Sequence, residues 1–158
     1  MTIYRIRAFA PADATRVRAI VTQALATMKL PLAPDGVDAD LADIPSAYRG
    51  GCFLVVEASD AGKAPRILGC GGIHDEGHGV FELRKMYFDE AIRGRGLGRK
   101  LLSVLLDVAR RKGGRRLRLE TNSRMREAIK LYEKFGFVRE EGAASIPPRC
   151  DIVMQRVL

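Results

Sequence analysis

The chain has no tryptophan, few other aromatic residues and only three cysteines among its 158 residues. Cys52, Cys70 and Cys150 share no CxxC-type spacing and are odd in number, which argues against a zinc site and a disulfide framework. The two histidines, His74 and His78, lie in a glycine-rich, turn-like stretch, where their spacing does not favour metal binding. We therefore expect reduced thiols and no bound metal.

Long apolar runs are also missing. No run approaches the roughly 20 residues that a membrane-spanning helix needs, and the amino terminus, with Arg5, Arg7 and Asp13, lacks the apolar core of a signal peptide. The length and the 47% hydrophobic content suit one domain with a real core. We expect a single domain over residues 1–158, cytoplasmic and without a membrane partner.

Basic residues outnumber acidic ones, giving a formal net charge of +8. Such a charge favours polyanionic partners, which include nucleic acid and phosphate-rich small molecules. Arginines concentrate in residues 93–99 and 110–118, with few interleaved aromatics to stack on bases. A phosphate-rich small molecule explains the first cluster better, so we expect no nucleic-acid partner. The rival hypothesis predicts tight, strongly salt-dependent binding of DNA or RNA.

Apolar periodicity and turn residues predict strands and helices along the whole chain. The expected strands are residues 2–9, 52–58, 66–74, 80–88, 115–120, 137–140 and 151–157. The expected helices are residues 11–28, a short stretch at 40–48, and the amphipathic segments 97–112 and 125–135. The pattern predicts an α/β domain of the α+β type.

The strand at residues 80–88 has an irregular apolar pattern. Its apolar positions are odd at Phe81 and Leu83 and then even at Met86 and Phe88. One extra residue between them, a β-bulge, would return both sets to buried faces, and bulges are enriched beside active sites. A central strand buried on both faces explains the pattern equally well.

The strongest local motif is Arg-Gly-Arg-Gly-Leu-Gly-Arg at residues 93–99, between a strand and a helix. Glycines let backbone N–H groups approach phosphate oxygens, and arginines and the helix dipole add attraction. The motif therefore suits a pyrophosphate, although a loop of solvated charges remains an alternative. Residues 98–101 lack the Lys-Ser/Thr pair of a Walker motif, which argues against a P-loop nucleotidase. A Rossmann loop would follow the first strand, whereas this motif lies in the second half of the chain, which argues against a Rossmann fold.

With these motifs the chain resembles the GNAT superfamily of N-acetyltransferases, whose acetyl-CoA signature is Arg or Gln, two residues, Gly, one residue, and Gly or Ala. Arg93, Gly96 and Gly98 match it, and the resemblance covers residues 80–137, including Asn122 after a strand. It implies a mixed, mostly antiparallel twisted sheet of about seven strands, flanked by about four helices, with splayed central strands.

The resemblance also divides the domain. Residues 1–79 would form the acceptor-side half, 80–137 the acetyl-CoA-binding core and 138–158 the carboxy-terminal strands. Segments 30–48 and 142–151 would recognise the acceptor, a primary amine of a small molecule, amino acid or peptide. Many relatives form dimers, so a homodimer is expected.

Acetyl-CoA is the co-substrate that the resemblance implies. Its pantetheine arm would pair with backbone groups near Met86 and Phe88, and the glycine loop would hold its pyrophosphate. Asn122 would contact the arm, although it equally suits a turn or helix cap. The expected binding residues are Met86, Tyr87, Phe88, Arg93, Gly94, Arg95, Gly96, Leu97, Gly98, Arg99, Asn122 and Tyr132.

For catalysis, the resemblance implies Glu82 as the base and Tyr132 as the acid that protonates the leaving thiolate. The alternatives are a structural carboxylate paired with Arg84 or Arg118, and a core tyrosine. We expect direct attack by the amine in a ternary complex, without an acyl-cysteine. A non-catalytic acyl-CoA-binding sensor or regulatory module is the alternative function.

Overall fold

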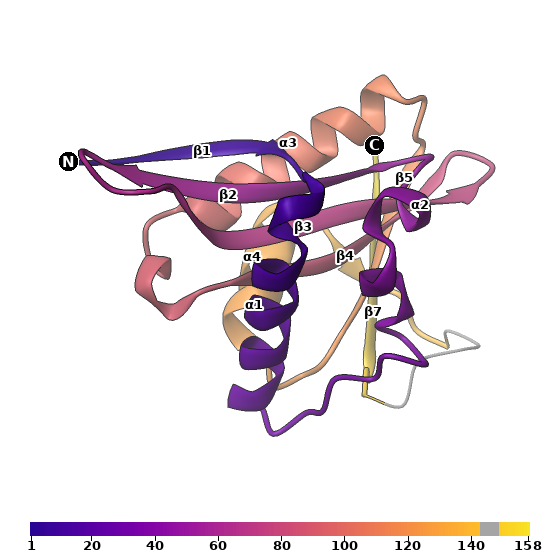
Figure 1. The fold of residues 1–158 in the computed structure, drawn as a ribbon. Helices are drawn as coiled ribbons and strands as arrows, with labels where there is room; N and C mark the ends of the chain where they lie inside the picture. Colours follow the sequence, from indigo (N-terminus) through magenta and orange to yellow (C-terminus); the bar gives the residue numbers. More distant parts are fainter. Residues whose placement is uncertain (143–148) are drawn as a thin grey trace.

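The structure, a computed structural model, describes residues 1–142 and 149–158 (Figure 1). In this part of the chain the strands are β1 (Thr2–Ala8), β2 (Cys52–Asp60), β3 (Arg66–Gly77), β4 (Val80–Phe88), β5 (Arg116–Thr121), β6 (Val138–Arg139) and β7 (Ile152–Val157). The α-helices are α1 (Ala14–Thr27), α2 (Ile44–Ala47), α3 (Leu97–Arg111) and α4 (Arg126–Lys134), with 3-10 turns at Pro11–Asp13, Ala39–Ala42 and Glu90–Ile92. The predicted elements are confirmed, with boundaries shifted by a few residues.

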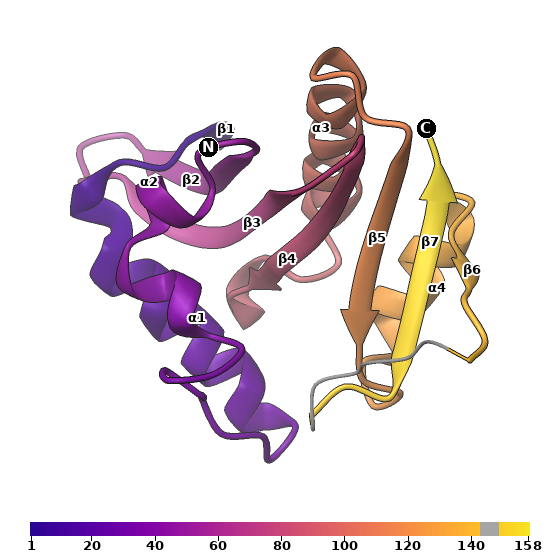
Figure 2. The same cartoon turned by 90° about the vertical axis from the view of Figure 1, so that its right-hand side faces the viewer.

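All seven strands form one sheet in the order β1-β2-β3-β4-β5-β7-β6. Neighbouring strands run antiparallel except β4 and β5, which are parallel. The β4–β5 pairing covers only Val80–Leu83 against Arg116–Leu119. Beyond it the two strands diverge toward their carboxyl ends, as Figure 2 shows. The predicted mixed sheet with splayed central strands is therefore confirmed.

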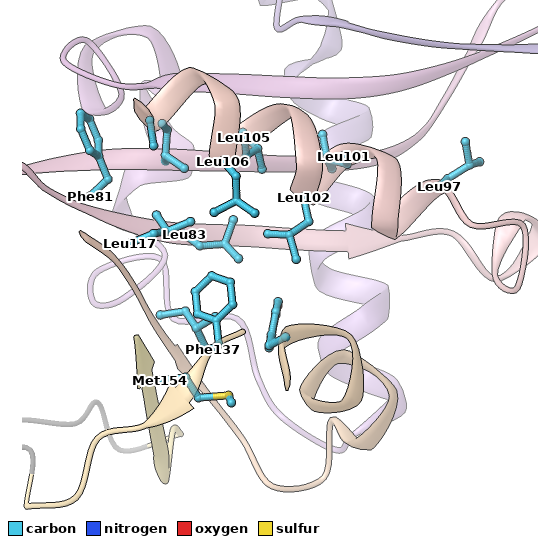
Figure 3. Packing of buried hydrophobic residues seen from close by; sticks show 14 of the residues in the cluster. Phe81, Leu83, Leu97, Leu101, Leu102, Leu105, Leu106, Leu117, Phe137 and Met154 are labelled. Carbon is cyan, nitrogen blue, oxygen red and sulfur yellow. The ribbon is translucent and has the colours of Figure 1, made fainter. Parts of the chain in front are cut away.

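Helices cover both faces of the sheet, with α1 packed on β3 and β4 and α3 on the opposite face (Figures 1 and 2). The larger apolar cluster fills the space between the sheet and helices α3 and α4, where Leu101, Leu102 and Leu105 of α3 are fully buried (Figure 3). A second cluster packs α1 and α2 against β2 and β3. Strand residues alternate between the two clusters because successive side chains point to opposite faces.

The predicted β-bulge lies in β4. Gly72 pairs with Arg84 and Cys70 pairs with Tyr87, so two residues of β4 stand opposite the single residue between Cys70 and Gly72. Lys85, one of these two, has a positive φ of 57°. This arrangement confirms the bulge. The alternative, a central strand buried on both faces, is wrong, because Phe81 and Leu83 are buried while Glu82 and Arg84 are partly exposed.

Candidate active site

A cavity of about 400 Å³ opens where β4 and β5 part. Its walls are residues 82–87 of β4, residues 119–122 at the end of β5, the carboxyl end of α1 with the segment that follows it, Tyr132 of α4, and residues 149–150. Because β4 stays paired with β3 through Phe88 but leaves β5 after Leu83, its edge toward the cavity carries unpaired backbone groups.

The structure brings several of the expected cofactor-binding residues to this cavity. Met86, Tyr87, Asn122 and Tyr132 line it. Phe88 does not, because its ring lies over Gly69, where even a methyl group would come within 2.6 Å of the ring.

The glycine loop lies at the amino terminus of α3, and none of its residues 93–99 lines the cavity. Gly94 and Gly96 have φ angles of 76° and 73°, which favour glycine. Within the described residues, the backbone N–H groups of residues 94–99 donate to no protein acceptor. Arg93, Arg95 and Arg99 are exposed around these groups, whereas the side chain of Leu97 is buried in the core. The loop thus presents free donors and positive charge to an anion.

Tyr132 packs in the core and also lines the cavity. The residue is 5% exposed, and its ring packs against Phe137 at a centroid distance of 5.8 Å. It also lines the cavity, and its hydroxyl has no hydrogen-bond partner among the described residues. Burial, together with the nearby Tyr87, raises the pKa of Tyr132, so the phenol is protonated at neutral pH.

Glu82 is held by two arginines. Its Oε1 accepts a hydrogen bond from Arg84 Nε at 2.7 Å, and its Oε2 accepts one from Arg118 Nη1 at 3.3 Å. These contacts match the structural alternative weighed for Glu82, although the carboxylate also lines the cavity. Its position follows from the β4–β5 register, which places Glu82 opposite Arg118.

Glu120 is a cavity residue for which the sequence pattern predicted no catalytic role. The only hydrogen bond that its carboxylate accepts from a described side chain comes from Arg118 Nη1, 3.0 Å from Oε1. Burial raises the pKa of Glu120, and the charge of nearby Glu82 raises it further. A carboxylate with a raised pKa and a free oxygen is a better proton acceptor than one held at both oxygens. Strand alternation puts Glu120 on the same face as Arg118, but only the β4–β5 pairing brings it near Glu82.

Comparisons with known proteins agree with this architecture. Residues 20–137 match the model of the acetyltransferase (GNAT) family. The chain belongs to the GNAT family. An N-acetyltransferase of Escherichia coli K12, YjgM, whose role is uncharacterised, is 42% identical over 81 residues, which cover 50% of this chain and 48% of YjgM. The chain thus matches only about half of that relative's length.

Solved GNAT structures share the whole fold. A GNAT acetyltransferase from Staphylococcus aureus Mu50 superposes with a TM-score of 0.87 at 18% identity, covering 98% of this chain and 99% of that one. The structure of yncA from Salmonella typhimurium, which was solved with its cofactor acetyl-CoA, has a TM-score of 0.71 at 24% identity and covers 98% and 94% of the two chains. At these identities the likeness establishes the fold.

Other groups in this GNAT chain are less suited to chemistry. All three cysteines are free, and burial raises the pKa of Cys70 to about 12 and that of Cys150 to about 11. Asn122 donates to the Arg149 carbonyl at 2.8 Å and accepts from the Arg124 N–H at 2.9 Å, so both ends of its amide are engaged.

Residues 1–142 and 149–158 contain neither a metal-binding cluster nor a membrane-spanning helix. No His, Cys, Asp or Glu cluster there is arranged to hold a metal ion. No helix in the same residues is both long and apolar enough to span a membrane.

Proposed function

We propose that this GNAT family member transfers the acetyl group of acetyl-CoA to a primary amine of a small molecule, amino acid or peptide, by direct attack in a ternary complex. One observation carries the proposal. The cavity between β4 and β5 combines an unpaired strand edge with two carboxylates and a phenol, Glu82, Glu120 and Tyr132. Such a site can align a linear thioester and move protons at both reacting atoms.

Acetyl-CoA fits the groups available along the edge of β4 and at the amino terminus of α3. The free N–H groups of residues 94–99 and the arginines around them would hold the pyrophosphate. The open edge of β4 near Met86 would pair with the amides of the pantetheine arm as an added strand. A methyl group at Gly94 or Gly96 would meet no protein atom within 4 Å, which leaves that space for phosphate oxygens.

The reaction needs one proton acceptor and one proton donor. The neutral acceptor nitrogen attacks the thioester carbonyl carbon, so an N–C bond forms while the C–S bond breaks. The nitrogen gives up a proton, and the departing thiolate takes one from the Tyr132 hydroxyl. A strand N–H that polarises the carbonyl would stabilise the charge that develops on its oxygen.

The contacts favour Glu120 as the proton acceptor. Glu82, the base that the family resemblance implies, has both oxygens bound to guanidinium groups. In our assignment Glu82 instead holds Arg118 and keeps the pKa of Glu120 raised by its charge. Glu120, directly or through one water, then takes the proton that the acceptor nitrogen loses as the N–C bond forms.

Titration calorimetry with acetyl-CoA, followed by a free-thiol assay on a panel of amines, amino acids and peptides, tests the proposal. We expect micromolar binding and thiol release that depends on the acceptor. Binding without turnover across the panel would favour the acyl-CoA sensor, and absence of binding would overturn both functions. Homodimerisation and a cytoplasmic location remain predictions for sedimentation and localisation experiments.

A further inference from the structure

A buried ion cluster lies on the acceptor side of the cavity. Lys85, at the β4 bulge, has a side chain that is only 5% exposed. Its ammonium lies 3.1 Å from Oδ1 of Asp38 and 3.1 Å from Oδ1 of Asp40, and it donates a hydrogen bond to the Val37 carbonyl at 3.0 Å. The residue that makes the bulge is thus tied to the segment that follows α1.

Arg149 joins the same cluster from the other end of the chain. Its Nη1 and Nη2 donate to the two carboxylate oxygens of Asp38 at 2.6 and 2.7 Å, and Nη1 also lies 3.2 Å from the Pro31 carbonyl. Asp38 is fully buried and accepts the Ala33 N–H at 2.8 Å as well. One carboxylate therefore connects three segments that are far apart in sequence.

These segments form one wall of the cavity. Val37, Asp40, Lys85 and Arg149 all line it, and they include both stretches expected to recognise the acceptor. Residues 143–148 of the second stretch lie outside the described residues. Burying charges costs free energy unless each is paired, and apolar residues could join the segments at lower cost. The cluster is therefore better explained by the orientation it imposes, because forked guanidinium contacts fix direction as well as distance.

We propose that Asp38 is a positioning residue for acetyl transfer. Its carboxylate holds the acceptor-side segment and Arg149 against the β4 bulge, so that the wall which receives the amine has a fixed place relative to the thioester. The inference rests on the proposed function. The partners of the Asp38 carboxylate are Ala33, Arg149 and Lys85, and include neither the glycine loop nor the backbone of Met86. Loss of the cluster should therefore affect the acceptor and spare acetyl-CoA binding.

Asp38→Asn tests the inference, with Asp35→Asn as the matched control. Asp35 is an exposed carboxylate in the same segment. For the best amine of the panel, we expect kcat/KM of Asp38→Asn to fall about 100-fold, as misplacement by an ångström can cause. Its Kd for acetyl-CoA should stay within about twofold of the wild-type value, because the variant leaves the residues proposed to bind acetyl-CoA unchanged. The binding free energy should therefore hardly change. Asp35→Asn should match the wild type in both measurements.

Arg149→Lys provides a second variant if Asp38→Asn fails to fold. It keeps the charge and loses the two-point contact, so a fall in kcat/KM of about tenfold is expected. Hydrogen exchange needs no acceptor: Asp38→Asn, or Arg149→Lys in its place, should speed exchange in residues 33–42 and leave residues 94–100 unchanged. Unchanged exchange, unchanged acceptor kinetics in the folded variants, or equal losses of acceptor kinetics and acetyl-CoA affinity would overturn the inference. Failure of the wild type to turn over any amine would instead count against the proposed function.

Discussion

Replacing Glu120 by Gln should lower kcat/KM for the acceptor by about 100- to 10,000-fold, the range typical of a lost general base. The variant should remain folded. Among the described residues, the Glu120 side chain accepts one hydrogen bond, from the partly exposed Arg118. Such pairs contribute about 0–1 kcal/mol, against a typical total stability of about 5–15 kcal/mol. Acetyl-CoA affinity should be retained, because the Glu120 carboxylate is bonded to Arg118 and not to the glycine loop or the β4 edge proposed to hold the cofactor.

The pH profile gives a sharper test than the rate alone. A carboxylate base acts when it is deprotonated, so wild-type kcat/KM should rise with pH through the pKa of Glu120. Because burial and the charge of Glu82 raise that pKa, the rise should lie above the ordinary value of 4.5. Glu82→Gln removes the neighbouring negative charge, which lowers the pKa of Glu120, and should therefore move the rise to lower pH while turnover persists.

Glu140→Gln is the matched control for these two variants. Glu140 lies 3.8 Å from Arg118 Nε, but it is not a cavity residue, so this variant should keep the wild-type rate and profile. The assay is thiol release across the pH range, with circular dichroism to verify folding. If Glu120→Gln kept the wild-type profile and Glu82→Gln lost the rise, Glu82 would be the base and our assignment would be wrong.

Three further predictions concern other parts of the molecule. Tyr132→Phe should cut turnover while melting temperature and acetyl-CoA Kd stay unchanged, because the lost hydroxyl has no protein partner among the described residues; normal turnover would exclude the acid role. Gly96→Ala and Gly62→Ala share a φ near 74° and should cost similar stability, about 1–2 kcal/mol, but only Gly96→Ala should weaken acetyl-CoA in calorimetry, by about tenfold or more. Burial alone would raise the pKa of Asp38, but hydrogen bonds from Arg149 and Ala33 and the charge of Lys85 lower it to about 2. Its contribution of about 2 kcal/mol should thus be present above pH 4 and lost as pH falls toward 2, whereas urea unfolding of Asp38→Asn should show a shallower pH dependence.

Much of the fold could be predicted because its signals are local. Helix α3 follows from the leucine stripe that includes Leu101 and Leu105, and its start follows from Gly96, whose positive φ caps it. The parity change between Leu83 and Met86 revealed the bulge, because strand periodicity of two makes one inserted residue visible. The glycine loop could also be predicted, because all of its backbone N–H groups belong to consecutive residues of one short motif.

The charges of the site were harder to predict because their partners are distant. From the sequence, Glu82 was the expected base and Glu120 had no expected role. The hydrogen bond from Arg118 to Glu82, which changes this assignment, joins residues 36 positions apart and depends on the pairing of β4 with β5. Lys85 would be expected in solvent, and its burial follows only from the fold around it.

The sequence alone thus determined the succession of strands and helices along the chain and the glycine loop at residues 93–99, and it offered the bulge as one of two explanations, because each depends on periodicity or on adjacent residues. Tertiary structure decided where β4 leaves β5, which carboxylate keeps a free oxygen, and how Asp38 meets Arg149, 111 residues later. Those features depend on the packing of distant segments around a shared core, and burial then changes the chemistry of the side chains it encloses.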